Sequence, residues 1–311
     1  MPVPGSIHIV TVNWNTGVYL RECLQSIVTA ARHDVNLTRV TVIDNASTDG
    51  SAACLDDLDL PLEVVHNSSN RGFAAACNQG AAGSEADYLL FLNPDTRVFP
   101  DSLALVTSFM DREQAAEIGI CGGQVVDPAG AATISCARLP TLPVVIGKMT
   151  GLNRLLPGVF PGHHLTPAET RHSRVVDQVI GAFFLVRREL FTRLDGFDTR
   201  YFIYYEEVDF ALRALRQGFH SYFLKEVGIV HLGSVSAGQV RDMRLYHSLR
   251  SRIVYARRHW TRRQALVLAI LTFAVELPVR LTMALLRKSR SDFFATASAY
   301  RRLIGDLRRL G

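Results

Sequence analysis

The sequence predicts an α/β protein built on a mostly parallel β-sheet. Short apolar runs alternate with helical patterns through the first third of the chain. The runs are continuously apolar, as in strands that are buried on both faces of a parallel sheet. With 311 residues, of which 48% are hydrophobic and 20% charged, the chain is long and apolar enough to bury a core.

Four strands and two helices are expected in this first third. Apolar runs place the strands at residues 7–12, 40–43, 62–65 and 88–92. The segment 18–31 repeats Leu20, Leu24 and Ile27 at helical spacing, and the Ala-rich segment 74–82 gives the second helix. Parallel sheets bind ligands at the carboxyl ends of their strands. Polar residues directly after strands are therefore the first candidates for function.

The second half of the chain is less regular. Prolines and glycines crowd residues 127–177, which favours a long loop region with short helices. Beyond it, the sheet is expected to resume at 179–186, and a helix is expected at 207–217. The apolar runs 221–224 and 227–230 then predict further strand structure.

Polar clusters follow the first two strands. Asn13 stands directly after the first strand, and Asp44 opens the segment Asp-Asn-Ala-Ser-Thr-Asp-Gly after the second. An aspartate at a strand end can accept a hydrogen bond from a base N–H. An ordinary Asx turn that caps the next helix is the alternative.

Two further clusters suggest anion and metal binding. Arg71 precedes Gly72 at a helix start, where a helix N-terminus favours an anion, although a simple loop explains it equally well. Asp95 follows the apolar strand 88–92 within Asn-Pro-Asp-Thr. A carboxylate there is well placed to hold Mg²⁺ or Mn²⁺ against a diphosphate, and a tight turn is the alternative.

An acidic cluster and a histidine complete the candidates. Glu206, Glu207 and Asp209 lie beside aromatic residues, where like charges are costly to bury. They are candidates for catalysis, or they complement the dipole of the helix that begins there. His231 follows an apolar run, where a hydrogen-bonded core histidine is the alternative to a ligand.

Together, these clusters resemble the inverting glycosyltransferases of family 2, which have the GT-A fold, and above all the rhamnosyltransferases of bacterial cell-wall and surface polysaccharides. The likeness covers residues 6–260. The matching stretches are VTVNWN (10–15), DNASTDG (44–50), NRGFAAACN (70–78), LNPDT (92–96), GAFFLVRR (181–188), GFD (196–198) and FIYYEEVDFALR (202–213). The resemblance implies a Rossmann-like nucleotide-diphospho-sugar transferase domain at 1–240. The charge and composition of residues 241–311 predict a basic, amphipathic helical extension after it.

The resemblance assigns a donor site. Asp44 would read the pyrimidine base of the donor, with Thr11 and Asn13 lining the same pocket. Arg71 is the candidate contact to the diphosphate. Asn93 stands at the first position of the family's D-x-D element and would touch ribose or metal-bound water rather than the ion.

The resemblance also assigns the chemistry. Asp95 would ligate the metal, Mg²⁺ or Mn²⁺, and His231 matches a histidine that approaches the metal or the diphosphate. Glu207 falls where the family usually has an aspartate general base, so its carboxylate sits about one methylene farther out. The sequence leaves open whether Glu206 or Glu207 is the base.

The C-terminal extension predicts membrane contact. Residues 1–240 hold 18 Lys/Arg against 25 Asp/Glu, whereas 241–311 hold 16 against 4. The apolar run 265–275 is interrupted by Glu276, Pro278 and Arg280, and is shorter than the about 20 residues of a spanning helix. An interfacial helix on the inner face of the plasma membrane is expected, beside a lipid-linked acceptor. Packing on the domain or on a second copy, as a homodimer, is the alternative.

Other classes fit less well. No G-x-G-x-x-G follows the first strand, which argues against a dinucleotide oxidoreductase, and no recognition motif for nucleic acid accompanies the basic tail. Five scattered cysteines without a C-x-x-C pair, and no signal-peptide pattern at the start, are typical of a cytoplasmic protein. The donor sugar stays open among rhamnosyl, galactofuranosyl, glucosyl and N-acetylglucosaminyl groups. A non-catalytic nucleotide-sugar-binding relative is a further alternative.

Overall fold

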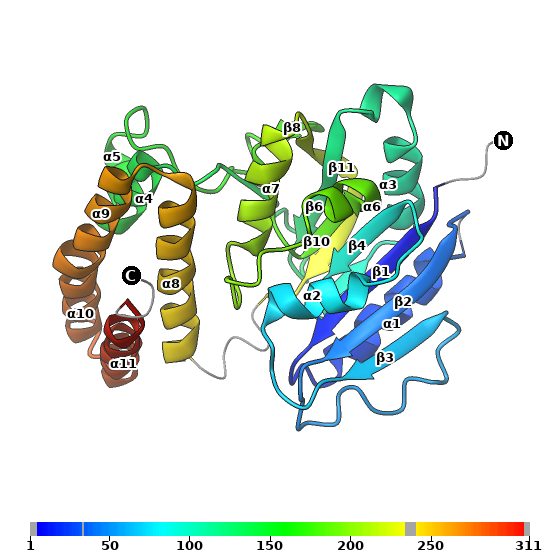
Figure 1. Cartoon of the computed structure of the whole chain (residues 1–311), viewed down its shortest axis with the longest axis horizontal. Helices are drawn as coiled ribbons and strands as arrows, with labels where there is room; N and C mark the ends of the chain where they lie inside the picture. Colours follow the sequence, from blue (N-terminus) through cyan, green and yellow to red (C-terminus); the bar gives the residue numbers. More distant parts are fainter. Residues whose placement is uncertain (1–4, 33, 234–240, 308–311) are drawn as a thin grey trace. The chain divides into compact units, whose positions relative to one another are not determined.

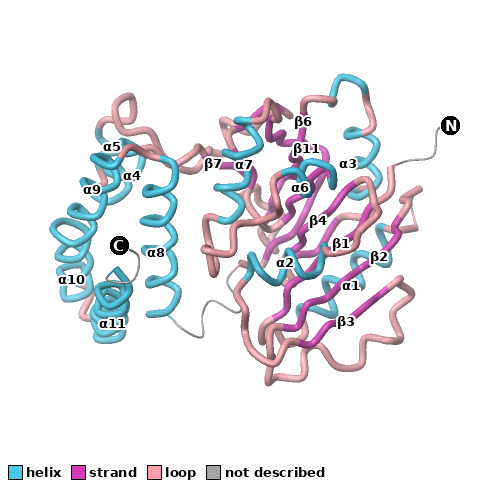
Figure 2. Tube along the Cα trace, in the orientation of Figure 1, coloured by secondary structure: helices cyan, strands magenta, loops and turns pink. Residues whose placement is uncertain are grey.

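The computed structural model describes residues 5–32, 34–233 and 241–307 (Figures 1 and 2). They belong to two compact units. One, here called the sheet unit, falls within residues 1–139, 164–199 and 206–236. The other, the helical unit, falls within 140–163, 200–205 and 237–311. Two internal segments of the chain are thus grouped with the C-terminal helices.

Nine of the described strands of the sheet unit form one mixed sheet, in the order β3-β2-β1-β4-β10-β6-β11-β5 with β8 beside β11. Strands β3, β2, β1 and β4 run parallel, as do β6 and β11, whereas β10, β5 and β8 pair antiparallel with their neighbours. The bounds are β1 Ile7–Asn13, β2 Leu37–Asp44, β3 Leu62–His66, β4 Tyr88–Leu92, β5 Thr96–Val98, β6 Ile118–Val126, β8 Arg174–Val176, β10 Phe183–Arg187 and β11 His220–His231.

Helices cover both faces of this sheet, which is why its central strands are apolar throughout. The helices are α1 Tyr19–Ala30, α2 Phe73–Ala81, α3 Ser102–Met110, α6 Arg188–Arg193 and α7 Glu206–Arg216, with a 3₁₀ turn at Glu113–Ala115. On β1, Ile7 and Ile9 pack with α1 and α3, whereas Val10 and Val12 pack with α2, α6 and α7. Figure 1 shows α2 in front of the sheet and α1 behind it. A small second sheet pairs β7 Cys136–Ala137 with β9 Gln178–Val179.

The predicted strands and helices of the first third are confirmed, with differences farther along. The sequence did not predict β5, α3 or β6. The segment 179–186 is divided between β9 and β10, and the two apolar runs after α7 form a single strand, β11, with an irregularity between Leu224 and Gly228.

All five cysteines are free. Cys54 is exposed, and the other four are buried. Burial raises the pKa of Cys23 and Cys121 well above the usual thiol range, and burial raises that of Cys136 to about 12. These thiols are therefore unreactive core residues.

The helical unit is a set of packed helices. Its elements are α4 Leu142–Thr150, α5 Leu152–Leu155, α8 Arg241–His259, α9 Arg262–Leu271, a π-helix Thr272–Glu276, α10 Leu277–Leu286 and α11 Arg290–Leu307. Tyr300 and Leu303 of α11 pack on Leu249 and Ile253 of α8.

The expectation that the apolar segment is too short for a spanning helix is wrong in length and composition. Residues Arg262–Leu286 form one continuous helix, because the π-helix carries the chain past Pro278. Glu276 is buried and pairs with Arg252 of α8 and with Arg280. Among the described residues this is the one helix long and apolar enough to cross a membrane by length and composition.

Candidate active site

Asn13 and Asp44 lie side by side at the carboxyl ends of β1 and β2. They are partners in the parallel register, and Asn13 Nδ2 donates to Asp44 Oδ1 at 2.8 Å. Because the chain adds β2 and β3 on one side of β1 and β4 on the other, this edge is a topological switch point. Such points form a crevice outside the strand ends, where ligands bind.

The carboxylate of Asp44 is fixed by a hydrogen bond but can still accept others. Its Oδ1 accepts from Asn13, whereas Oδ2 has only longer contacts, to the backbone N of Ser47 and to Nδ1 of His66, both at 3.3 Å. Asn13 is fixed in turn by the hydroxyl of Ser51 at 2.8 Å. A fixed carboxylate with spare acceptor capacity suits recognition of an N–H group. His66 ends β3 next to Asp44, and sequence reasoning missed it although it also directly follows a strand.

Thr11 lies deeper. It is fully buried two residues before Asn13, on the face that carries Ile7 and Ile9. Among the described residues, no group hydrogen-bonds its Oγ1. The structure therefore places Thr11 in the wall beneath Asn13.

Arg71 is connected to the Asp44 turn through Asn45. Asn45 Oδ1 accepts from Asn67 Nδ2 at 2.9 Å, and its Nδ2 lies 3.3 Å from the carbonyl oxygen of Gly72. Arg71 is exposed, and its Nη1 donates to Gln79 at 3.2 Å. The guanidinium is thus held at the start of α2 while its remaining N–H groups stay available to an anion.

Asp95 and His231 meet because β5 pairs with the end of β11. His231 is opposite Thr96 in that register, and the backbone N of Leu232 donates to the carbonyl oxygen of Asp95 at 3.1 Å. The side chains lie 3.2 Å apart, His231 Nε2 to Asp95 Oδ1. The two residues named as metal ligands from the sequence are thus in direct contact.

This pair fits a divalent cation completed by its substrate. Among the described residues, no group of three or more His, Cys, Asp or Glu side chains could hold a metal. One carboxylate and one imidazole leave the other coordination positions to diphosphate oxygens and water, as Mg²⁺ and Mn²⁺ allow.

The three acids at the start of α7 differ in their surroundings. Asp209 is fully buried and pairs with Arg213, Oδ2 to Nε at 2.6 Å. Glu206 is buried near Cys77, and burial together with the charge of Glu206 raises the pKa of that thiol. Glu207 is the one acid of the three whose side chain is partly exposed, although its Oε2 atom is buried. It is therefore the candidate base among the three.

Glu207 and the Asn93–Asp95 turn flank the same two residues. A Cβ on Gly181 would lie 3.8 Å from Glu207 Cγ. The backbone N of Asn93 donates to the carbonyl oxygen of Ala182 at 3.1 Å. The candidate base and the turn that carries Asp95 are therefore neighbours across β10.

Two other motif residues, Asn78 and Gly196, serve packing. Asn78 accepts from the backbone N of Phe197 at 2.9 Å and donates to its carbonyl oxygen at 2.7 Å. Phe197 then packs on Phe91 and Phe210, with ring centroids 4.9 and 5.4 Å apart. The GFD segment thus anchors α7, which carries Glu207.

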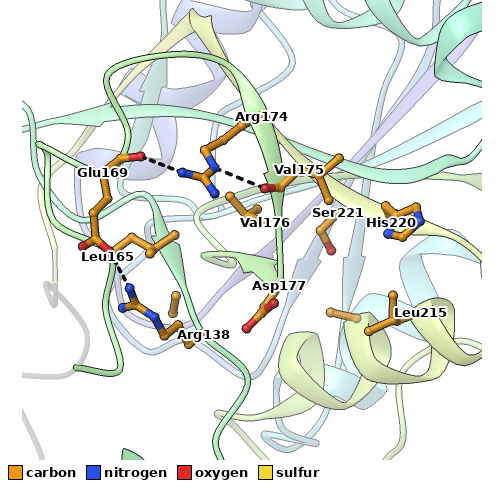
Figure 3. A pocket seen from close by; sticks show the side chains of 12 residues that line it. Arg138, Leu165, Glu169, Arg174, Val175, Val176, Asp177, Leu215, His220 and Ser221 are labelled. Carbon is orange, nitrogen blue, oxygen red and sulfur yellow. Dashed lines mark hydrogen bonds and ion pairs between the residues drawn. The ribbon is translucent and has the colours of Figure 1, made fainter. Parts of the chain in front are cut away.

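A separate hollow of about 270 Å³ lies at the other end of α7 (Figure 3). Ala211 and Leu215 of α7 line it, and none of the predicted site residues does. Its charged groups are already engaged with one another: Arg138 pairs with Glu169, and Asp177 accepts from the backbone N of Leu139 at 2.9 Å. We assign it no part in the site.

Two family models match the chain: glycosyl transferase family 2 over residues 6–151, and glycosyl transferase family group 2 over residues 88–303. An N-acetylglucosaminyl-diphospho-decaprenol L-rhamnosyltransferase of Mycobacterium tuberculosis is 28% identical over 247 residues, 74% of this chain and 77% of the relative. The rhamnosyltransferase WbbL of Escherichia coli is 30% identical over 151 residues, 48% of this chain and 53% of the relative.

A solved structure shares the fold. The mannosyltransferase PcManGT from Pyrobaculum calidifontis, in complex with GDP-Man and Mn²⁺, superposes with a TM-score of 0.57 at 16% identity, covering 98% of this chain and 88% of that one. The predicted fold class, a GT-A sheet followed by C-terminal helices, is confirmed.

Proposed function

The chain belongs to glycosyltransferase family 2, and on that premise we propose that it transfers L-rhamnose from dTDP-rhamnose to a polyprenyl-diphosphate-linked glycan in cell-wall or surface-polysaccharide synthesis. The printed names of two relatives support the sugar, and one of them names a decaprenyl-diphosphate-linked N-acetylglucosamine. The printed names do not exclude a galactofuranosyl, glucosyl or N-acetylglucosaminyl donor, which is the nearest alternative.

In this proposal the nucleotide-sugar donor binds in the crevice at the carboxyl ends of β1, β2 and β4. Asp44 accepts a hydrogen bond from the pyrimidine N–H through its less engaged oxygen, while Asn13 holds the other oxygen in place. Thr11 forms the wall below the base, and Asn93 faces the ribose. Arg71 donates to the diphosphate at the start of α2.

Asp95 and His231 hold the divalent cation, Mg²⁺ or Mn²⁺, which when bound stabilises the charge of the leaving diphosphate. The Mn²⁺ in the mannosyltransferase of the same fold supports this choice. Glu207 accepts the proton of the acceptor hydroxyl as that oxygen forms a bond to the anomeric carbon. The bond from that carbon to the diphosphate oxygen breaks in the same step, so the anomeric configuration inverts.

One observation carries this function: the partly exposed side chain of Glu207 and the Asp95 turn flank the same two residues at the carboxyl edge of the sheet. This proximity supports a base and a diphosphate site that act on one anomeric carbon. The burial of Glu206 and the ion pair of Asp209 favour Glu207 as the base.

We further propose that the helical unit attaches the enzyme to the inner face of the plasma membrane, where a lipid-linked acceptor is found. The exposed side chains of Leu266, Ile270, Leu285 and Leu286 support an apolar contact. Arginines at both ends of the helix support attraction to anionic headgroups. Pairing with a second copy of the chain is the alternative use of this surface.

A donor screen with matched variants tests the enzymatic proposal. Purified protein is assayed for binding and hydrolysis of dTDP-rhamnose, UDP-galactofuranose, UDP-glucose, UDP-N-acetylglucosamine and GDP-mannose, with and without Mg²⁺ or Mn²⁺. Glu207→Gln should lower kcat by roughly 10²–10⁴-fold and leave donor binding intact. Glu189→Gln, an exposed change on α6, is the control.

Each result has a defined meaning. Selective, metal-dependent use of dTDP-rhamnose supports the proposal, and use of another donor refutes the sugar. Near-normal turnover by Glu207→Gln refutes the base. Binding of no donor at all favours a non-catalytic relative.

A further inference from the structure

The helical unit contains a hollow of about 370 Å³, lined by residues of α8, α10 and α11. Its polar lining includes Arg241, Arg280 and Arg287, against one carboxylate, Asp292. Glu276 pairs with Arg280 and Asp292 pairs with Arg241, so the third guanidinium, that of Arg287, leaves the hollow with a net positive charge, which favours an anion.

The three arginines are engaged to different degrees. Arg280 is held by Glu276, with Nε at 3.0 Å and Nη2 at 2.8 Å from the same carboxylate oxygen. Arg241 makes a 3.2 Å contact with Asp292 in which both side chains are largely exposed, so the pair contributes little stability. In the described part of the chain, the side chain of Arg287 has no ion-pair partner. The hollow thus offers one fixed guanidinium and two that can move to a ligand.

The rest of the lining is apolar apart from Thr296. Leu245, Val279, Met283 and Ala284 contribute to it, and Val279 and Met283 are also partly exposed. The hollow is therefore continuous with the apolar surface of α10. An occupant that fits both parts carries an anionic group and a hydrocarbon chain.

The π-helix keeps that outer surface continuous. It adds one residue to a turn and so shifts the helical register by about 100°. As a result, Thr272 and Ala284 both remain buried, while Ile270 and Leu285 both remain exposed. Without this extra residue, the exposed apolar faces of α9 and α10 would point in different directions.

The buried face of the helix Arg262–Leu286 favours an orientation of this helix along the membrane surface rather than across the bilayer. Glu276 pairs with Arg252 of α8, a helix of nineteen residues that is rich in arginine. Crossing the bilayer would bring this charged helix into hydrocarbon, which is costly. A helix with one apolar face and one charged, packed face suits the interface.

We propose that the hollow binds the phosphate of an anionic membrane phospholipid, with Arg287 and Arg241 on the phosphate and the acyl chains along Val279 and Met283. The inference deepens the membrane attachment proposed above. It does not depend on the identity of the sugar or on the base. The proposal adds a specific binding site for a lipid phosphate to the general electrostatic attraction between arginines and anionic membranes.

Vesicle sedimentation of the full-length protein tests this site. Vesicles of phosphatidylcholine alone are compared with vesicles of phosphatidylcholine mixed with phosphatidylglycerol. The pocket variant is Arg241→Gln with Arg287→Gln. The control is Arg262→Gln with Arg263→Gln, which removes the same charge from the same helical unit outside the hollow.

The pocket variant should bind the anionic vesicles at least about tenfold more weakly than the control variant, a difference of 1.4 kcal/mol. Equal losses in the two variants would mean diffuse electrostatic attraction and would overturn the site. No preference for anionic vesicles in the natural protein would overturn it too. Binding of inorganic phosphate that is lost in the pocket variant, together with equal vesicle binding by the pocket and control variants, would show a site for free phosphate instead of lipid.

Folding and function are monitored in the same samples. Met283→Gln leaves every arginine in place and should also weaken binding to anionic vesicles, because the acyl chains lose apolar contact. Unchanged binding by this variant contradicts the lipid assignment. Binding of dTDP-rhamnose by each variant reports on the sheet unit, so failure of the lipid site and failure of the transferase proposal give different results.

Discussion

Replacing Gly196 by alanine should destabilise the sheet unit by about 2–4 kcal/mol while leaving its chemistry intact. Gly196 has a φ of +66°, and a Cβ there would lie 2.6 Å from Asn78 Oδ1. The left-handed conformation costs alanine about 1–2 kcal/mol. The clash also displaces the amide of Asn78, and each of its two hydrogen bonds to Phe197 contributes about 1 kcal/mol.

A matched glycine separates the two contributions. Gly83 has a φ of +67° with open space around its Cβ position, so Gly83→Ala should cost only the about 1–2 kcal/mol of the left-handed conformation. Asn78→Ala removes the closest obstacle and leaves Phe191 Cζ at 3.2 Å from the added Cβ. In that background, Gly196→Ala should cost less than it does in the natural chain and approach the cost of Gly83→Ala.

Urea unfolding measures these differences. Trp14 lies in the sheet unit and Trp260 in the helical unit, so a Trp260→Phe background lets fluorescence report on the sheet unit. Additive costs for Gly196→Ala and Asn78→Ala would refute the contact, since residues that touch show coupling. A fall in kcat of the folded Gly196→Ala protein would refute the view that this motif serves packing.

Two further predictions concern protons and metal. Burial, with the charge of Arg39, lowers the pKa of His8 from 6.5 to about 4. As the pH drops from 6.5 to 4, His8 becomes protonated in the unfolded chain before it does in the folded protein, so the free energy of unfolding decreases. His8→Gln should remove up to about 3 kcal/mol of this decrease, measured by urea unfolding at each pH. An unchanged pH dependence would contradict the prediction. Chelation should abolish turnover and Mn²⁺ should restore it. Asp95→Asn should weaken metal binding by more than the roughly 10–100-fold that is typical when a residue behind a metal ligand is changed. The control Asp101→Asn, an exposed change, should leave metal binding unaltered. Equal effects of the two variants would count against Asp95 as a ligand.

The position of the candidate donor residues was predictable because it depends on strand ends. Asn13 and Asp44 each end a strongly apolar strand, and parallel neighbours bring such residues to one edge of the sheet. His66 obeys the same rule, since it directly follows the predicted strand 62–65, and it was missed although β3 itself was predicted.

The metal side was not predictable from periodicity. Asp95 and His231 meet through β5, a strand of three residues that is too short to give a pattern. Only the family resemblance linked His231 to Asp95. Local sequence holds no signal for a contact between residues so far apart.

Strand β6 was missed for a different reason. It contains Gly119, Gly122 and Gly123, which dilute the apolar pattern. A Cβ at Gly122 would lie 2.6 Å from Val179, and one at Gly123 would lie 2.5 Å from Val227. Neighbouring segments pack too closely on β6 for larger side chains, so these positions require glycine. The same glycines weaken the apolar pattern from which a strand is predicted.

The contact between Asp95 and His231 also has a consequence for biosynthesis. The ribosome makes Asn13 and Asp44 within the first fifty residues, but the partner of Asp95 arrives only with the end of β11. A nascent chain that has already folded its first strands therefore still lacks the histidine that contacts Asp95. If the proposed cation site is correct, it is completed only late in synthesis, when His231 emerges.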